Sequence, residues 1–204
     1  AEVLAIYGRM KTSQARTLEQ AHRDAAARVA RLCRRNGATW VKAAQFLSCR
    51  PDILPQSYID ALAPLQNDAQ VVHFDQLKPA LINAWGEDWT RHFEVFDLVP
   101  VATASIAQVH HARLKTGEEV AVKVRLPEVA AQFDQDASLF RLLARLAAPL
   151  VRELDVIQIT EQLLTMTATE LDFRNEAENL RRFARLPHPP GIQVPPLFDE
   201  LSGE

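Results

Sequence analysis

Residues 101–124, VATASIAQVHHARLKTGEEVAVKV, contain the pattern that decides the fold. The stretch ends in Val-Ala-Val-Lys-Val, and the side chains of a strand alternate between its two faces. The three valines therefore share a face that suits a core, whereas Ala121 and Lys123 share the other face. A small alanine beside a lysine suits a pocket in which an adenine lies flat and an ammonium group reaches phosphate.

A hairpin is predicted to join this strand to an earlier one. Residues 115–117, Lys-Thr-Gly, have the character of a tight turn, because glycine adopts positive φ without strain. Ile106, Val109 and Leu114 indicate strands before the turn. The loop that enters these strands is a candidate phosphate-binding loop, and it contains Ala102, Thr103, Ala104 and Ser105. Such loops work by bringing backbone N–H groups close to phosphate.

An acidic segment about fifty residues downstream is predicted to supply a partner for the lysine. Residues 170–180, ELDFRNEAENL, have the periodicity of a helix, whose apolar stripe is Phe173, Ala177, Leu180 and Ala184. Glu176 is the candidate partner of Lys123. Taken alone, the segment is equally typical of a solvated helix face, and only its combination with the strand favours the pairing.

The strand resembles the V-A-I-K strand of kinases, in which the lysine pairs with phosphates and with a helix glutamate. Four blocks taken together resemble the UbiB family of atypical kinase-like proteins, also called AarF or ADCK proteins, which are linked to coenzyme Q biosynthesis. The blocks are a KxGQ-like stretch at residues 42–55, an Ala-rich stretch at 102–110, the Lys123 strand, and an ExD motif at 170–172. The sequence departs from the family pattern at Ala44, where the KxGQ block has glycine, and at Thr103 within the Ala-rich stretch.

The resemblance implies an α+β fold with a helical N-terminal extension, residues 1–92, packed on a protein-kinase-like small lobe, residues 93–204. The small lobe is expected to combine an antiparallel sheet with helices. We expect the chain to be a fragment that lacks the second lobe, which carries the catalytic and metal-binding Asp residues of kinases. His22-Arg23-Asp24 spells the tripeptide of the kinase catalytic loop, but it precedes the Lys123 strand and lies in an Ala- and Arg-rich helical segment.

The resemblance also implies roles for individual residues. Lys123 and Glu176 would form the catalytic pair, and ATP or ADP would lie against residues 102–105 and Ala121. Mg²⁺ would be bound in the full-length protein, with no metal ligands in this chain. A regulatory motif is expected to bring two residues of the KxGQ-like block to face two residues of the ExD motif, and these four are Lys42, Gln45, Glu170 and Asp172.

Two functional interpretations remain open at this point. In the first, the chain is the ATP-binding part of an atypical kinase or ATPase, a transferase that supports ubiquinone biosynthesis. In the second, it is a non-catalytic, kinase-shaped module that binds a lipid-like precursor or biosynthetic enzymes under nucleotide control. The expected partners are nucleotide together with membrane lipid, a coenzyme Q precursor or coenzyme Q biosynthetic enzymes, at a cytoplasmic site with peripheral association to the inner membrane.

Composition agrees with a globular domain. Hydrophobic residues make up 48% of the chain, charged residues 24%, and the formal net charge is −3, so bulk charge gives no case for nucleic-acid binding. The sequence contains no uninterrupted apolar stretch long enough for a bilayer span. Cys33 and Cys49 lack CxxC spacing, which favours reduced thiols. His110 and His111 are adjacent on a predicted strand, so they face opposite ways and are not expected to share a metal.

Helices are predicted around the strands. Ser13 is expected to cap a helix that ends at Asn36, with Gly37 as its stop, and a second helix carries Trp40 to Phe46. Leu139, Leu142, Leu143 and Leu146 are expected to form the core-facing side of a later amphipathic helix. The remaining segments are helices over 56–66, 74–85, 128–148 and 156–186, followed by a Pro-rich connector over 187–196.

Overall fold

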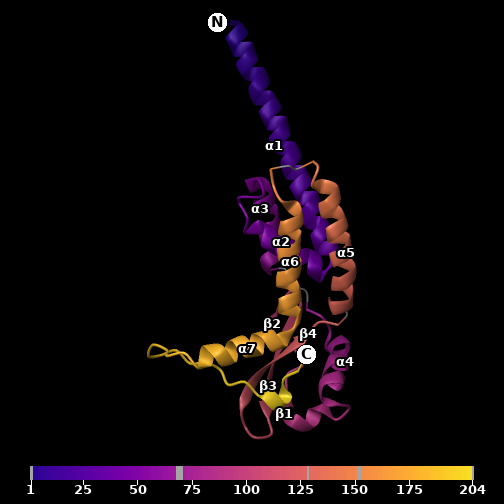
Figure 1. The fold of residues 1–204 in the computed structure, drawn as a ribbon, viewed down its shortest axis with the longest axis vertical. Helices are drawn as coiled ribbons and strands as arrows, with labels where there is room; N and C mark the ends of the chain where they lie inside the picture. Colours follow the sequence, from indigo (N-terminus) through magenta and orange to yellow (C-terminus); the bar gives the residue numbers. More distant parts are fainter. Residues whose placement is uncertain (1, 68–70, 128, 151–152, 204) are drawn as a thin grey trace. The chain divides into compact units, whose positions relative to one another are not determined.

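The computed structural model describes residues 2–67, 71–127, 129–150 and 153–203, and for residues 2–17 it describes the backbone alone (Figure 1). The chain forms two compact units, residues 1–69 and residues 70–204. The first unit is helical, and the second combines a small antiparallel sheet with helices.

Three helices and a 3-10 turn form the first unit. Helix α1 spans Glu2–Asn36, α2 spans Ala38–Ser48, α3 spans Gln56–Leu62, and the 3-10 turn η1 spans Ala63–Asn67. Their core contains Ala30, Cys33, Ala44, Leu62 and Leu65.

The predicted stop of the first helix is confirmed, and its predicted start is wrong. Gly37 follows the helix with a φ of 92°, a left-handed conformation that glycine adopts without strain. Ser13 lies inside α1, which already begins at Glu2. The residues before Ser13 include Leu, Ala, Met and Lys, which are good helix formers, so the helix continues through a residue type that often caps.

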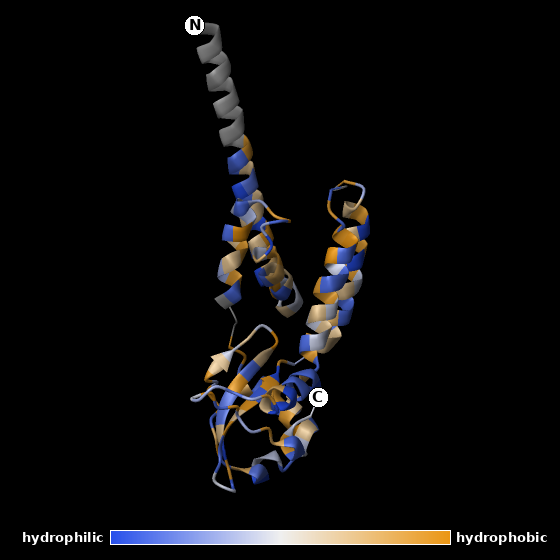
Figure 2. Cartoon of the chain, turned by 60° about the vertical axis from the view of Figure 1, so that its left-hand side comes forward, coloured by the Kyte–Doolittle hydropathy of each residue, from blue (hydrophilic) through white to orange (hydrophobic). Residues whose placement is uncertain are grey.

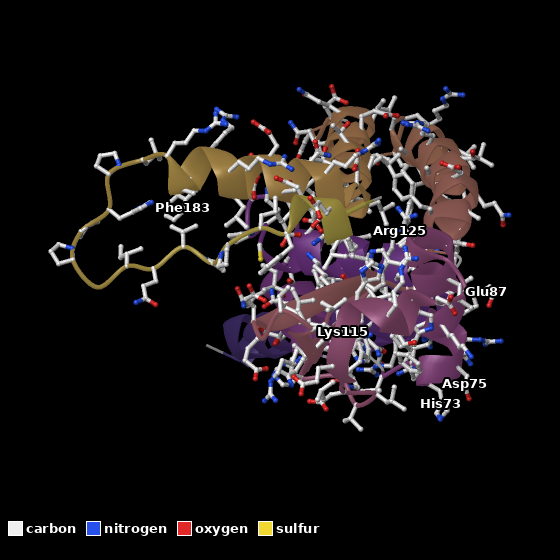
Figure 3. All side chains as sticks on the ribbon, turned by 90° about the horizontal axis from the view of Figure 1, so that it is seen from below. His73, Asp75, Glu87, Lys115, Arg125 and Phe183 are labelled. Atoms are coloured by element: carbon white, nitrogen blue, oxygen red, sulfur yellow. The ribbon has the colours of Figure 1, made fainter. Side chains whose placement is uncertain are left out.

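The sheet of the second unit is antiparallel and centred on one long strand. Strand β3 (Ala107–Leu114) pairs along one edge with β1 (Phe93–Phe96) and β2 (Ala102–Thr103), and along the other edge with β4 (Glu119–Arg125). The β3–β4 hairpin turns at Gly117, whose φ is 102°, as predicted. Lys115 in this turn and Arg125 at the far end of β4 are both labelled in Figure 3.

The core of the second unit lies between the sheet and helix α4 (Phe74–Trp85), which is followed by the 3-10 turn η2 (Trp89–His92). Val124 is buried in this core and Val120 and Val122 pack against it, as their alternation predicts. Helix α4 therefore packs with the sheet, whereas the sequence-based division at residue 92 grouped it with the extension. The buried members of this core are Leu77, Leu81, Trp89, Phe93, Ala112, Leu114 and Val124.

A buried glutamine ties the start of the second unit to the sheet. Gln108 on β3 is fully buried, its Oε1 accepts a hydrogen bond from the backbone N–H of Val72, and its Nε2 donates to the carbonyl of Val72 at 3.2 Å. One side-chain amide thus satisfies both backbone groups of a residue that has no strand partner there. Burying the amide without these bonds would be costly.

Helices α5 (Val129–Ala147) and α6 (Val156–Leu171) lie side by side in the second unit. Arg141 of α5 makes two hydrogen bonds to Glu161 of α6, at 2.7 and 3.0 Å. Ala137 and Ala144, both buried, share this face of α5 with Arg141 because they lie one turn before and after it. Glu128, the predicted first residue of this helix, lies outside the described residues.

The predicted core-facing side of α5 is not buried in the structure. Its four leucines are 41–61% exposed, because the face around Arg141 is the one that meets α6. Figure 2 shows hydrophobic residues along this helix pair. The four are Leu139, Leu142, Leu143 and Leu146.

None of the helices within the described residues combines the length and the apolar character that a bilayer span requires.

The predicted continuous helix over residues 156–186 is wrong, because the chain bends at Asp172. This residue has extended backbone angles, φ −95° and ψ 99°, and separates α6 from helix α7 (Phe173–Ala184). The segment after α7 returns to the sheet (Figure 1), where the 3-10 turn η3 (Asp199–Leu201) lies and the indole of Trp85 donates to the carbonyl of Leu201 at 3.2 Å.

Replacing Leu77 by Ala should lower the free energy of unfolding of the second unit by about 2 to 5 kcal/mol, because the side chain is fully buried and leaves a cavity. Leu98→Ala is the matched control, since Leu98 is 57% exposed and should change stability by less than about 0.5 kcal/mol. Urea unfolding followed by circular dichroism measures both. Equal losses would contradict the assignment of the core.

Candidate functional site

The site is built around an ion pair between β4 and α7. The Nζ of Lys123 donates a hydrogen bond to the Oε2 of Glu176, across a sequence separation of 53 residues. The Lys123 side chain is 35% exposed and the Glu176 side chain 63%. The predicted pairing of these two residues is confirmed, and the roles assigned to them stay predictions.

An aromatic ring completes the environment of the ammonium group. The Nζ of Lys123 lies 4.6 Å from the ring centroid of Phe173, within the range of a cation–π contact. Phe173 and Glu176 are three residues apart on α7 and therefore lie on one side of that helix. Phe173 is predicted from the sequence to lie in an apolar stripe, and its spacing of three residues from Glu176 is the signal that also indicates a contact with the lysine.

The register of the sheet places the Ala-rich loop beside this lysine. Val109 of β3 pairs with Ala102 on one side and with Lys123 on the other. Residues directly opposite each other in a sheet project from the same face, so these three side chains lie in a row. Ala121, two residues before Lys123, shares that face, which is the one opposite the buried Val124.

A tight turn closes the Ala-rich loop, residues 102–105. The backbone N–H of Ala104 donates to the carbonyl of Ala107 at 2.7 Å, which joins the end of β2 to the start of β3. Ala102 and Thr103 pair with β3, so the loop is a continuation of the sheet at this point. Its residues carry Cβ atoms that restrict the backbone more than glycine would.

Asp172 of the ExD motif sets the direction of α7. Its Oδ1 accepts a hydrogen bond from the backbone N–H of Arg174 at 3.0 Å, which is an N-cap, and both carboxylate oxygens accept from the Arg174 guanidinium at 2.9 Å. The Arg174 side chain chiefly, and the backbone bond next, hold the pKa of Asp172 below its usual value. This carboxylate is therefore ionised and engaged at the start of the helix that carries Glu176.

Arg125 links the strand of Lys123 to the junction between the two helices. Its Nη1 donates a hydrogen bond to the carbonyl of Leu171, the last residue of α6, at 3.1 Å. A cation is favourable at a helix C-terminus, where carbonyl groups lack helical partners. Arg125 was not among the predicted site residues, although its position two residues after Lys123 places it on the same strand face.

The KxGQ-like residues lie on α2 of the first unit. The Nε2 of Gln45 donates to the carbonyl of Leu65 at 3.3 Å, and Lys42 is partly buried. Ala44 is fully buried in the core of this unit, so the methyl group that replaces the family's glycine is in contact with other core residues. The expected approach of Lys42 and Gln45 to the ExD motif, which belongs to the second unit, stays a prediction.

The carboxylates near the site do not form a ready set of ligands for Mg²⁺. Asp172 is bound to Arg174, and Glu176 is bound to Lys123. Within the part of the chain that the structure describes, no three His, Cys, Asp or Glu side chains cluster as a metal site would require. Since Mg²⁺ prefers free carboxylate oxygens, these residues do not fit the ion by themselves.

Comparisons with known proteins show which family this chain resembles. Residues 64–204 match the ABC1 atypical kinase-like domain. A probable protein kinase UbiB of Vibrio vulnificus is 38% identical over 175 residues, which cover 82% of this chain and 32% of that protein. AarF domain-containing protein kinase 1 of Mus musculus is 32% identical over 197 residues, which cover 96% of this chain and 37% of that protein. The chain thus spans about a third of the length of these curated relatives.

A solved structure supports the same fold. The structure of the Rv3197–erythromycin complex from Mycobacterium tuberculosis matches with a TM-score of 0.53 and 29% sequence identity. The match covers 91% of this chain and 47% of that chain. Together with the domain match, it identifies the sheet and helices of the second unit as a kinase-like small lobe.

Replacing Arg125 by Met should loosen the junction between α6 and α7, because the carbonyl of Leu171 loses its charged donor. The expected cost is about 1 to 3 kcal/mol, with faster hydrogen–deuterium exchange in peptides covering residues 171–180. Arg91→Met, at an exposed arginine of η2, is the control and should leave these peptides unchanged. Unchanged exchange in the Arg125 variant would show that the bond does not hold the junction.

Proposed function

The chain belongs to the ABC1 atypical kinase-like family, which includes UbiB and AarF domain-containing proteins, and from this premise we propose that its second unit binds ATP or ADP. The observation that carries the proposal is the ion pair between Lys123 and Glu176 beside the Ala-rich loop. In a kinase-like small lobe, such a pair positions a lysine for nucleotide phosphates.

The residues around Lys123 suit the binding of phosphate. The ammonium group would donate charge-assisted hydrogen bonds to phosphate oxygens while Glu176 and the ring of Phe173 keep it in place. Because two groups of one helix hold the lysine, its position depends on the position of α7. The junction at Asp172 and the hydrogen bond from Arg125 would therefore act on phosphate binding through the helix.

The row of small side chains beside the lysine suits the rest of the nucleotide. Ala121 leaves room for a flat adenine on the face of β4 that carries Lys123. Backbone N–H groups of the Ala-rich loop, residues 102–105, would approach the phosphates. The Cβ atoms of its alanines and Thr103 restrict the loop to fewer conformations than glycine would allow, so its position must be set by its anchors in the sheet.

For the whole protein we propose a UbiB-type atypical kinase or ATPase that supports coenzyme Q biosynthesis. The resemblance of four motif blocks and the match to a protein named UbiB support this proposal. Mg²⁺ would be held by residues of the full-length protein, because Asp172 and Glu176 are each engaged by a cation. Its partners would be a coenzyme Q precursor, membrane lipid or biosynthetic enzymes, at a peripheral site on the inner membrane.

A second candidate is a non-catalytic module that binds a lipid-like precursor or biosynthetic enzymes under nucleotide control. The observation that favours it is the pairing of Asp172 with Arg174, which engages a carboxylate beside the site in a structural cap. ATP turnover by the full-length protein, measured with and without vesicles of membrane lipid, distinguishes the candidates. Turnover lost in a Lys123 variant supports the enzyme, and nucleotide binding without turnover supports the module.

Replacing Lys123 by Ala in the full-length protein should weaken nucleotide binding by about tenfold to a hundredfold, which is the range of a lost charge-assisted hydrogen bond. Isothermal titration calorimetry with ADP measures the change. Lys115→Ala is the matched control, because Lys115 is exposed in the β3–β4 turn (Figure 3). This variant should bind ADP with the affinity of the wild type. Wild-type affinity in the Lys123 variant would contradict the proposed site.

Replacing Lys42 by Ala in the full-length protein should alter nucleotide affinity, if the KxGQ-like and ExD motifs act on one site as the family resemblance implies. A partly buried lysine is expected to have an acidic partner, so its loss should disturb the carboxylate that it meets. The same ADP titration measures the effect, with the exposed Lys78→Ala as control. Identical affinities in both variants and the wild type would favour a purely structural role for α2.

A further inference from the structure

Asp97 is held by two adjacent histidines of β3. The backbone N–H of Asp97 donates to the carbonyl of His111 at 2.9 Å, and the carbonyl of Asp97 accepts from the Nδ1 of His110 at 2.8 Å. The carboxylate Oδ2 of Asp97 lies 2.7 Å from the Nδ1 of His111. The two histidines face opposite ways, as alternation predicts, yet both reach the same residue.

Asp97 is the upstream anchor of the segment that leads into the Ala-rich loop. The next bond to β3 is made by Val101, whose N–H donates to the carbonyl of Val109 at 2.8 Å. The carbonyls that accept these bonds belong to His111 and Val109, which are two residues apart on β3. Asp97 and Val101 are four residues apart, so residues 98–100 protrude between the two bonds. Leu98 and Val99 are 57% and 78% exposed, in agreement with this. The chain's path into β2 therefore depends on these two anchors, and β2 and the loop after it are held further by their own pairing with β3 and by the bond from Ala104 to Ala107.

His110 holds Asp97 through a hydrogen bond to its backbone carbonyl. It is fully buried against Phe74 and Phe96, with ring centroids at 5.9 and 5.5 Å. Because a carbonyl oxygen only accepts, the Nδ1 must carry the proton that it donates to Asp97. The Nε2 finds no hydrogen-bond partner among the described residues, so a second proton there would have no acceptor. Among the described residues, His110 therefore bonds Asp97 through its Nδ1 alone.

His111 holds Asp97 through a contact with its carboxylate, and this contact depends on the charge of the imidazole. Its Nδ1 faces Asp97 at 2.7 Å and its Nε2 faces the Oε2 of Glu119 at 2.5 Å. Ionised carboxylates only accept hydrogen bonds, so both contacts form together only when both ring nitrogens carry protons. The pKa of His111 is raised, by the hydrogen bond to Asp97 first and by the one to Glu119 next.

The charges around His111 come from three strands and the segment after β1. Arg113 of β3 donates to the Oε1 of Glu119 at 2.6 Å, which chiefly keeps the pKa of Glu119 below its usual value, and Arg113 also lies 3.8 Å from Glu94 of β1. Glu119 therefore stays ionised and continues to favour a charged His111. The imidazolium thus bridges β4 to the segment after β1, across β3.

We propose that His110 and His111 are positioning residues for the Ala-rich loop, and that deprotonation of His111 loosens the Asp97 anchor and weakens nucleotide binding. The nucleotide part of this proposal rests on the proposed function. A neutral imidazole keeps one N–H, so at one of the two carboxylate contacts the ring nitrogen presents a lone pair to the carboxylate and the hydrogen bond is lost. The loop then retains the backbone bonds made by Asp97, Val101 and Ala104, and loses either the contact between the Asp97 side chain and His111 or the bridge to Glu119.

The direction of the pH effect follows from the raised pKa of His111. Below about pH 6.5, the ordinary histidine value, the group is charged in the folded and unfolded chain and the contribution of the bridge to stability is complete. The contribution is lost as the pH rises through the higher pKa of the folded state. We therefore expect a well-ordered loop in mildly acidic solution and a looser loop in mildly alkaline solution.

The anchor is tested first without nucleotide, in the full-length protein. Hydrogen–deuterium exchange, corrected for the intrinsic rate at each pH, is compared for residues 97–105 at about pH 6 and about pH 8.5. Protection should fall at the higher pH in the wild type and in His73→Gln, whose exposed histidine lies beside Asp75 (Figure 3). His111→Gln should show low protection at both values, and His111→Arg, which is permanently charged, high protection at both. Equal protection of the wild type and His111→Gln at about pH 6 would overturn the anchor.

The coupling to nucleotide is tested next by ADP titration of the same variants. The affinity of the wild type relative to His111→Gln should fall by about threefold to tenfold between the two pH values. This ratio cancels the titration of the phosphate itself, and His73→Gln should follow the wild type. A constant ratio would overturn the coupling even if the exchange result stands. Absence of ADP binding in every protein would instead refute the proposed function, and the exchange result would still decide the anchor.

Discussion

The register between β3 and β4 is the constraint on which the second unit depends. It places Val109 opposite Lys123, so the valines of β4 face the core while the lysine faces the site. A slip of one residue would exchange the two faces, burying the ammonium group and exposing the valines. The tight turn at Gly117 fixes this register, and the burial of Val124 against α4 gives it its energetic preference.

Strand β3 also organises the segments that are not strands. Its core-facing side carries two buried polar residues, Gln108 and His110, which bond the backbone of Val72 and of Asp97. These side chains satisfy backbone groups that a neighbouring strand would otherwise pair. The entry into the unit and the approach to the Ala-rich loop are thus both attached to the same strand, and unpaired buried polar groups would be the cost of moving them.

The position of Lys123 depends on the junction between α6 and α7, which consists of the single residue Asp172. Arg125 binds the last carbonyl of α6, and Asp172 caps the first turn of α7, so the bend is stabilised on both sides. Since α7 carries both groups that hold the ammonium, the bend determines where the lysine lies. Strand and helix are therefore coupled by two contacts from β4, through Lys123 and through Arg125.

The sequence by itself determined the hairpin, the facing of Lys123 and its pairing with Glu176, because two-residue alternation, turn glycines and a distinctive set of motifs are local signals. Only the tertiary structure decided the bend at Asp172 and the exposure of the leucines of α5. Helix periodicity continues through Asp172, and it cannot tell which apolar face finds a partner. The contacts of His110 and His111 with Asp97 could not be predicted either, because they join residues that only the sheet brings together.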